Sequence, residues 1–380
     1  MKAYQLSVPT KVYFGRNILE KSLEACSEYL KGSILVVTTG RSLVRLGHLD
    51  RLREGILRSG NVNEIFFFQE ISANPRLSEI HEGIMMGKQR KADVVVGFGG
   101  GSALDAAKAI AAGVGMDMDI YDIFKTGQEP SDATLPIIAI PTTAGTGSEL
   151  SKAAIITDEQ QEKKGGIRGT ALYPSVAIVD SAFTETIPFQ TTMETGFDVL
   201  AHAIETYISK AATPFTEILS EQAIKIVGEY LPRLAGDLGD VEAREKMSFA
   251  SMIMGINLGN ASTCLPHRMQ YPVGAHTDTS HGAGLAAMYP AWIEYEYEYS
   301  REKIEQIFHL FLNESCCSGV RAAELMKGFL DKLQMSRSLR GLGITEEMVA
   351  GMATEVTGNI HNDPAADGQD IIRKIYRGSL

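Results

Sequence analysis

The stretch ADVVVGFGGGSALD, residues 92–105, decides the fold class of this chain of 380 residues. Its first half, ADVVVGF at 92–98, is expected to be a strand, and its second half begins a helix. The glycines between them place free backbone N–H groups and the positive end of a helix dipole where a phosphate can bind. A tight turn with a capping box from Ser102 to Asp105 is the alternative, and this loop alone does not decide between the two.

Strands and helices alternate on both sides of this unit. Strands are expected at 33–38, 63–68, 92–98, 135–140, 153–157 and 176–179, and helices at 43–59, 77–91 and 102–114. From about Phe183 only helical spacing remains, at 191–210, 214–231, 241–258, 300–312, 318–334, 345–355 and 368–377. We therefore predict a Rossmann-like α/β domain with a mostly parallel sheet at residues 1–183 and an all-α domain at residues 184–380.

A second loop, PTTAGTGSE at residues 141–149, follows another expected strand. Three threonines and a serine in this loop supply hydroxyl donors for phosphate or ribose oxygens. An ordinary polar loop is the alternative, although four hydroxyls in nine residues are many for such a loop. Two loops of this kind after parallel strands are typical of ligand binding at the carboxyl ends of a sheet, so together they favour nucleotide binding.

A candidate metal site lies in the helical half. Asp198 and His202 are four residues apart in an expected helix, so both project from one face. His267 and His281 follow further along the chain. One carboxylate and three imidazoles suit Zn²⁺ or Fe²⁺ better than Mg²⁺. Taken singly, such a pair is more often a surface ion pair and a lone histidine more often structural, and His276 stays open as a further candidate.

The composition argues against several other classes of protein. Lys and Arg number 36 against 47 for Asp and Glu, and the resulting net charge of −11 argues against a nucleic-acid partner. No apolar run approaches the roughly 20 residues that a membrane helix needs, and residues 1–5 show no secretory signal. Four cysteines are too few and too scattered for a disulfide framework. We expect a cytoplasmic enzyme.

With both loops and the four candidate ligands in view, the chain resembles the iron-containing (group III) alcohol dehydrogenase family, within the dehydroquinate synthase-like superfamily. The matching segments are PTKVYFG at 9–15, GGGSALDAAK at 99–108, PTTAGTGSE at 141–149 and GFDVLAHAIE at 196–205. The resemblance implies a dinucleotide-binding α/β domain and a helical metal-binding domain whose ligands are Asp198, His202, His267 and His281. It also implies cofactor contacts at Thr39, Arg41, Gly99, Gly100, Gly101, Ser102, Asp105, Thr142, Thr143, Thr146, Ser148 and Lys164.

Two positions depart from the family pattern. The family places a histidine four residues after its third ligand, where this chain has Tyr271. NAD-dependent members commonly carry Asp after the second strand to bind the ribose 2′-hydroxyl, whereas this chain has TTGRS at 38–42. An arginine and hydroxyls accept a 2′-phosphate, so the expected cofactor is NAD(P) with a preference for NADP. Arg41 as a solvated loop residue is the alternative.

The resemblance implies reversible reduction of a small aldehyde, with Fe²⁺ or Zn²⁺ as Lewis acid and the nicotinamide as hydride donor. Tyr271 is the candidate for proton transfer. Arg268 is the candidate for binding a carboxylate or phosphonate, which favours an anionic substrate such as phosphonoacetaldehyde, unless Arg268 is structural and pairs with an acid such as Asp278.

Three other functions remain as alternatives. A dehydroquinate-synthase-like lyase needs several basic residues near the ligands, and the ligand helices offer mainly Arg268. A catalytically inactive relative or a metal-free reductase is disfavoured by the complete ligand set. A homo-oligomer without nucleic-acid or membrane partners is expected.

Overall fold

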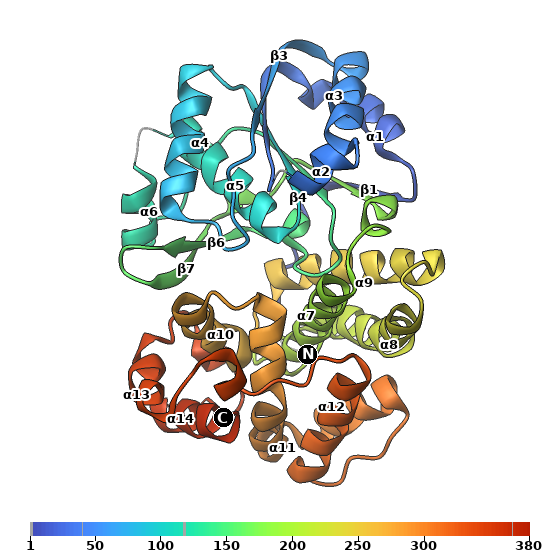
Figure 1. Ribbon diagram of the computed structural model, residues 1–380, viewed down its shortest axis with the longest axis vertical. Helices are drawn as coiled ribbons and strands as arrows, with labels where there is room; N and C mark the ends of the chain where they lie inside the picture. The colour runs from blue at the N-terminus through green and yellow to red at the C-terminus, as the bar shows by residue number, and fades with distance from the viewer. Residues whose placement is uncertain (1–2, 40, 117–118, 367) are drawn as a thin grey trace.

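The computed structural model describes residues 3–39, 41–116, 119–366 and 368–380. Two halves follow one another along the chain (Figure 1). The first surrounds a sheet with helices, and the second is built from helices. The elements change from strands to helices between Asp180 and Phe189. The division into domains at residue 183 stays a prediction.

A six-stranded sheet forms the centre of the first half. Its strands are β1 (Lys11–Gly15), β2 (Lys31–Val37), β3 (Asn61–Phe68), β4 (Val94–Gly99), β5 (Ile137–Pro141) and β8 (Val176–Asp180), in the order β1-β8-β5-β4-β2-β3. Every pairing between them is parallel. All residues of β4, β5 and β8 are buried, because helices cover both faces of the sheet. The predicted fold class is confirmed.

Side chains along β2 alternate between two separate cores. The helices of this half are α1 (Leu19–Ala25), α2 (Arg41–Arg45), α3 (His48–Ser59), α4 (Leu77–Gln89), α5 (Gly101–Gly115) and α6 (Ile120–Thr126). Leu35 and Val37 of β2 belong to the core formed with α4, α5 and α6. Ile34 and Val36 belong to the core formed with α1 and α3, as the period of two in a strand requires.

Two of the expected elements differ from the structure. The helix expected at 43–59 is two helices, α2 and α3, because Gly47 between them has φ +71°. The strand expected at 153–157 is not part of the sheet. It is β6 (Ala153–Asp158), which pairs antiparallel with the unpredicted β7 (Lys163–Arg168) in a separate hairpin.

The capping box that was the alternative for the first glycine loop does not form. Helix α5 begins at Gly101, and Gly100 is its N-cap residue. The Ser102 hydroxyl donates to the carbonyl of Ala73, and Asp105 accepts hydrogen bonds from other segments. The N-terminus of α5 therefore has no side-chain cap, and its glycines let the backbone lie close to neighbouring segments.

The second half contains α7 (Phe189–Ile208), α8 (Pro214–Gly236), α9 (Val241–Asn260), α10 (Leu265–Thr277), α11 (His281–Leu312), α12 (Gly319–Lys332), α13 (Glu346–Glu355) and α14 (Gln369–Gly378). All seven expected helices overlap one of these. Helix α10 and the part of α11 before Ser300, where the helix has a non-helical φ of −129°, were not predicted. Short 3₁₀ turns are η1 (Ser27–Tyr29), η2 (Ser148–Leu150), η3 (Thr170–Leu172), η4 (Ser181–Thr184), η5 (Arg340–Leu342) and η6 (Ile360–Asn362).

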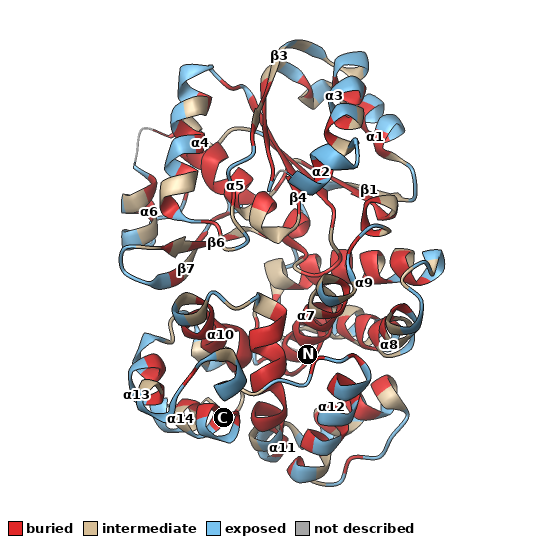
Figure 2. Ribbon diagram, in the orientation of Figure 1, coloured by how far each residue is buried: buried red, intermediate tan, exposed pale blue. Residues whose placement is uncertain are grey.

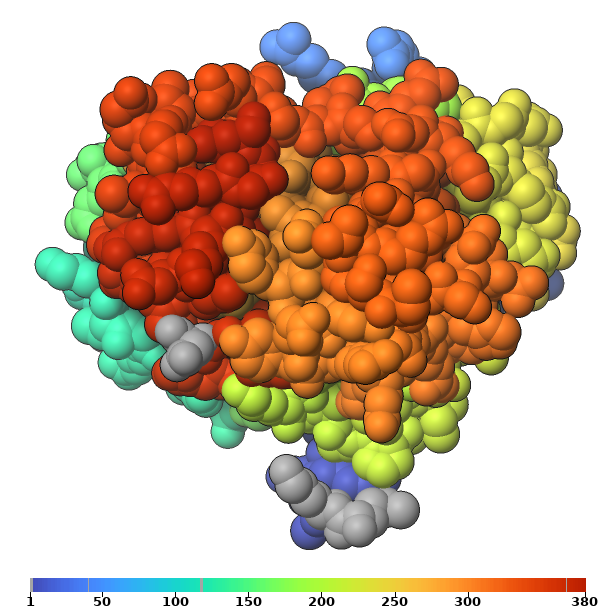
Figure 3. All heavy atoms as spheres, turned by 90° about the horizontal axis from the view of Figure 1, so that it is seen from below, coloured from blue at the N-terminus to red at the C-terminus, as the bar shows by residue number. Residues whose placement is uncertain are grey.

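Helix α7 and the first part of α11 form the interior of this half. Figure 2 shows both buried along most of their length, whereas α12 to α14 alternate between buried and exposed residues. Seen from below, the later helices, coloured orange to red, form the outer face of the molecule (Figure 3). Within the described ranges, no helix is both long and apolar enough to cross a membrane. The metal-ligand candidates thus project from the most buried helices of the protein.

Candidate metal and cofactor site

The four predicted metal ligands lie together where α7, α10 and α11 meet. Asp198 and His202 project from α7, His267 from the first turn of α10, and His281 is the first residue of α11. Asp198 Oδ1 lies 3.4 Å from Nε2 of both His267 and His281, and 3.8 Å from Nε2 of His202. The His202 ring stacks on that of His267 with 4.4 Å between centroids. Segments 83 residues apart therefore converge on one carboxylate oxygen.

Two neighbouring side chains fix the orientation of these imidazoles. His267 Nδ1 lies 2.7 Å from Glu205 Oε1, and His281 Nδ1 lies 2.7 Å from Gln270 Oε1. Both partners are acceptors, so each Nδ1 carries the hydrogen and each Nε2 faces Asp198. Sequence analysis did not find Glu205 or Gln270. The available signal was a polar residue three positions after a candidate ligand, one helical turn along.

The arrangement fits a divalent cation. Asp198 Oδ1 and His267 Nε2 are buried and have no hydrogen-bond partner. Asp198, His267 and His281 each offer one ligand atom, and these atoms lie within 4.8 Å of one another. Oxygen and imidazole nitrogen held this close are a ligand set for Fe²⁺ or Zn²⁺. His202 stands next to this group.

The charged groups around the site favour the binding of a cation. Burial lowers the pKa of His202 to about 3, so this imidazole is neutral. Burial also acts to lower the pKa of His267, but the carboxylates of Glu205 and Asp198 outweigh it and raise the pKa to about 10. Burial acts to raise the pKa of Asp198, yet the imidazoles, led by His202, hold it well below its usual value. A metal bound here would displace a proton from His267, so its binding would weaken as the pH falls.

The two predicted cofactor loops lie side by side at the carboxyl ends of β4 and β5. Gly99 pairs with Pro141, and the backbone N–H of Thr142 donates to the Gly99 carbonyl at 2.9 Å. A Cβ on Gly101 would lie 2.5 Å from Thr146, and Gly99 has φ +156°. The glycines are therefore required for the close approach of the loops. Gly100, Ser102 and Thr143 stand at the same edge of the sheet.

Asp105 and Ser148 hold the second loop against α5. Asp105 accepts from the Ser148 hydroxyl at 2.5 Å and from the N–H of Ile155 at 2.9 Å. Lys108, completely buried, donates to Ser148, Ser151 and the carbonyl of Ala153. Sequence analysis assigned no role to Lys108, although a lysine within an alanine-rich helix was a signal. The structure places Asp105 and Ser148 within this network, and their contact with a cofactor stays a prediction.

Lys164, on β7, lies between the cofactor loops and the metal-ligand group. Its Nζ donates to Asn74 at 2.9 Å, and Asn74 donates to Asp278 at 2.8 Å. Burial lowers its pKa to about 8, against the opposing charges of Asp105, Asp278 and Asp198. At the other end of the site, Thr39 and Arg41 are exposed beyond the end of β2.

Arg268 and Tyr271 lie together on α10. Arg268 Nη1 donates to the Tyr271 hydroxyl at 3.1 Å and Nη2 to that of Ser262 at 3.1 Å. The two residues are 5% and 6% exposed. Asp278, the acid suggested as a structural partner of Arg268, accepts from Asn74 instead. His276 Nε2 lies 2.7 Å from Glu355 Oε2, and His276 is not among the residues that group around Asp198.

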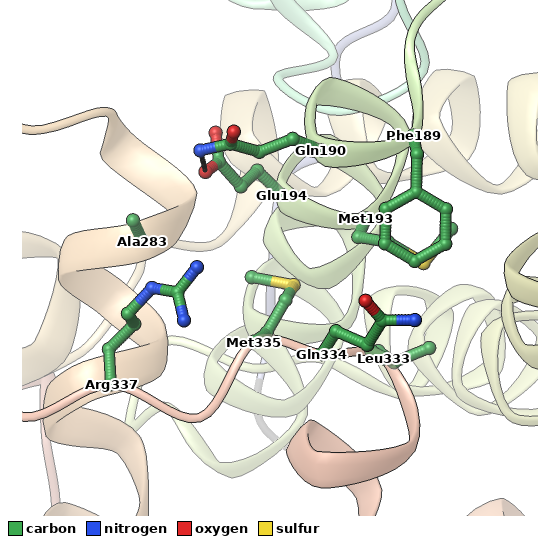
Figure 4. A pocket seen from close by; sticks show the side chains of 9 residues that line it. All are labelled: Phe189, Gln190, Met193, Glu194, Ala283, Leu333, Gln334, Met335 and Arg337. Atoms are coloured by element: carbon green, nitrogen blue, oxygen red, sulfur yellow. Dashed lines mark hydrogen bonds between the residues drawn. The ribbon is translucent and has the colours of Figure 1, made fainter.

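A separate pocket of about 180 Å³ lies where the first turns of α7 meet the segment that follows α12. Figure 4 shows Arg337 and Met335 on one side of it and Gln190 and Glu194 on the other. Gln190 donates to Glu194 at 2.8 Å. Neither the candidate metal ligands nor the cofactor loops line this pocket.

Comparison with known proteins agrees with this geometry. The chain matches the family described as iron-containing alcohol dehydrogenase over residues 9–181, and the C-terminal part of the Fe-containing alcohol dehydrogenase family over residues 192–380. It is 30% identical to the 1,3-propanediol dehydrogenase of Klebsiella pneumoniae over 99% of this chain and 98% of that one. It is 35% identical to aldehyde-alcohol dehydrogenase 2 of Entamoeba histolytica over 76% of this chain, but spans only 34% of that relative.

Among solved structures, the chain resembles sulfoacetaldehyde reductase from Bifidobacterium kashiwanohense in complex with NAD⁺. The TM-score is 0.87 at 27% identity, over 100% of this chain and 99% of the other. The fold is shared with a nicotinamide-dependent oxidoreductase. The chain belongs to the iron-containing alcohol dehydrogenase family. Its class of substrate is a small alcohol or aldehyde, and these matches do not favour the lyase alternative.

Proposed function

We propose that the protein is a metal-dependent, NAD(P)-linked reductase of small anionic aldehydes that also catalyses the reverse oxidation of the alcohol. The observation that carries this proposal is the convergence of Asp198, His267 and His281 beside Lys164. Lys164 lies close enough for its charge to affect the pKa of His281. The same elements thus bring together a cation-binding group, a basic side chain and two cofactor loops.

Asp198, His202, His267 and His281 would hold Fe²⁺ or Zn²⁺. When bound, such a cation acts as a Lewis acid on a carbonyl oxygen. Glu205 and Gln270 keep the imidazoles of His267 and His281 turned toward Asp198. Burial of Asp198 and His267 limits competition from water for the same ligand atoms.

The loops at 99–102 and 142–148 would bind the cofactor's phosphates through backbone N–H groups and hydroxyls, and the nicotinamide supplies the hydride. Thr39 and Arg41 would bind the ribose end, and we infer a preference for NADP because no acid stands there to repel a 2′-phosphate. Lys164 would lie at the nicotinamide end, near the metal ligands.

Tyr271 is the proposed proton donor. Its hydroxyl oxygen accepts from Arg268, which leaves the hydroxyl hydrogen free to reach a substrate oxygen. Tyr271 is one helical turn beyond His267 on α10, so its side chain lies on the same face as that ligand. It stands where the family pattern has a histidine.

A small anionic aldehyde is supported by Arg268, which no carboxylate neutralises among the residues described here. Phosphonoacetaldehyde-like and carboxylated aldehydes are the candidates. A structurally similar reductase is named for sulfoacetaldehyde, which is also anionic. The same family membership supports a cytoplasmic homo-oligomer.

The test is a panel of anionic and neutral aldehydes assayed with NADH and NADPH on protein stripped of metal and then loaded with Fe²⁺. We expect turnover that depends on the added metal and is fastest with an anionic aldehyde. Absence of turnover with every aldehyde and both cofactors would contradict the proposed function.

A further inference from the structure

One face of β7 points toward α10. Gly165 and Ile167 face the core of the first half, since a Cβ on Gly165 would lie 3.2 Å from Phe124 and Ile167 is fully buried there. Successive residues of a strand point to opposite sides. Lys164, Gly166 and Arg168 therefore share the other face, and Lys164 Nζ lies 3.7 Å from the position of a Cβ on Gly274 of α10. The Arg168 guanidinium folds back over Gly166, since its Nη2 lies 3.6 Å from the position of a Cβ on Gly166.

Arg268 lies on α10 opposite this face and is buried without a counter-ion. Its Nη1 and Nη2 donate to the neutral hydroxyls of Tyr271 and Ser262, and its Nε has no partner. Among the described residues, no carboxylate lies within ion-pair distance of Arg268 or of Arg168. A buried guanidinium with only neutral partners is unfavourable unless an anion is bound beside it.

Arg168 lies on the face of β7 that points toward α10, the helix that carries Arg268 and Tyr271. Burial of its guanidinium is the largest effect on its pKa and lowers it, although the residue as a whole is exposed. The Tyr271 phenol opposes this lowering, and the charge of Arg268 adds to it. Two arginines from opposite halves of the protein thus lie near Tyr271, close enough for their charges to repel each other.

We propose that Arg168 and Arg268 together bind a tetrahedral oxyanion, a phosphonate or a sulfonate, at the end of a short aldehyde substrate. This inference rests on the proposed function and specifies its substrate class. A planar carboxylate can form both of its hydrogen bonds with one guanidinium in a bidentate contact. A phosphonate or sulfonate carries three oxygens around its central atom, so it can accept hydrogen bonds from two guanidinium groups on different sides. The site is complete only when β7 and α10 face each other across the two halves.

The position of the two arginines also limits the length of the substrate. Tyr271 and His267 are four residues apart on α10, and such neighbours are about 5–6 Å apart at their Cβ atoms. An aldehyde carbon near the metal ligands and an oxyanion near Tyr271 then belong to a short substrate. The cofactor phosphates have their own loops at the ends of β4 and β5, so they do not need this pair of arginines.

The test compares Arg168→Gln and Arg268→Gln with Arg58→Gln, whose arginine is exposed on α3 and pairs with Glu54. Substrates are phosphonoacetaldehyde, sulfoacetaldehyde, malonic semialdehyde and the neutral isostere 3,3-dimethylbutanal. We expect Arg168→Gln to raise KM for the phosphonate or the sulfonate by about tenfold or more, and KM for 3,3-dimethylbutanal by less than about twofold. The preferred oxyanion shows which of the two is the ligand.

Several results would overturn the proposal. One is an Arg168→Gln variant whose KM rises equally for charged and neutral aldehydes. Another is a wild-type preference for malonic semialdehyde that Arg168→Gln leaves unchanged. A third is an Arg168→Gln variant in which only the KM for the cofactor rises. Direct binding separates this proposal from the proposed function. 2-Hydroxyethylphosphonate or isethionate should raise the melting temperature of the wild-type and Arg58→Gln proteins but not of Arg168→Gln, even if no aldehyde is reduced. No stabilisation of the wild-type protein by either compound would refute the anion site.

Discussion

Glu205 Oε1 lies 2.7 Å from His267 Nδ1, so a buried carboxylate on α7 orients a candidate metal ligand on α10. The other oxygen of Glu205 accepts from the backbone N–H of Cys264 at 2.8 Å. One side chain therefore fixes both the tautomer of His267 and the start of its helix. Asp198 and Glu205 together supply two carboxylates to a site that suits a divalent cation.

Glu205→Gln is expected to weaken metal binding by about 10–100-fold, because the amide keeps a hydrogen-bonding group but loses the charge that supports His267. The dissociation constant for Fe²⁺ or Zn²⁺ can be measured by competition with a chelator. Glu194→Gln is the matched control on the same helix, since Glu194 accepts from Gln190 and contacts no ligand. An unchanged affinity in Glu205→Gln would show that the pair does not support the site.

The wild-type protein is expected to use NADPH with a higher kcat/KM than NADH, because Thr39 and Arg41 stand where an acid would repel the 2′-phosphate. Arg41→Ala should lower kcat/KM for NADPH by about tenfold, the loss of one charge-assisted contact, and leave NADH nearly unchanged. Steady-state kinetics with both cofactors measure this. A clear advantage for NADH in the wild-type protein would refute the NADP preference.

A buried carboxyl pair is expected to make stability depend on pH. Glu296 and Asp363 are fully buried, and Glu296 accepts from the N–H of Ala365 at 3.2 Å. Burial, with the charge of Asp363, raises the pKa of Glu296 to about 9. The folded protein therefore keeps a proton that the unfolded chain loses from about pH 4.5 upward, so the stability from this group falls as the pH rises toward 9.

Glu296→Gln imitates the protonated acid and should flatten this decline, so that the variant gains stability relative to wild type between pH 5 and 9. Thermal unfolding across this range measures the effect, with exposed Glu302→Gln as the control. Parallel curves for the wild-type and Glu296→Gln proteins would show that Glu296 is ionised in the folded state.

The elements predicted correctly are those whose signal is local. The run Val94–Phe98 and the glycines after it determine β4, its loop and α5 without help from distant residues. The pairing of β6 with β7 was missed because KKGGIR has no alternation of apolar residues. Lys164 is buried by segments distant in the chain, among them α10 and Asn74. Helix α10 was missed because it contains Pro266, Pro272 and Gly274, which are poor helix formers that tertiary packing accommodates.

The candidate site also contains some residues that could be predicted from the sequence and others that could not. The four candidate metal ligands could be named from the sequence because the family resemblance covers them, and the structure brings them close together, although their role as ligands stays a prediction. Arg168 could not be predicted, since it is 100 residues from Arg268 in the chain and meets Tyr271 only when the two halves pack. Glu205 lies within a matching segment, but its role depends on the position of His267, which sequence spacing does not give.

The measurement that tests the central claim most directly is the metal content and aldehyde-reductase rate of His267→Ala and His281→Ala beside the wild-type protein. Each protein would be stripped of metal and then given one equivalent of Fe²⁺. The wild-type protein should retain the metal and recover its rate, whereas each variant should lose both while its circular dichroism spectrum stays that of the folded protein. A variant with the metal content and rate of the wild-type protein, or metal-free wild-type protein that is fully active, would contradict the account.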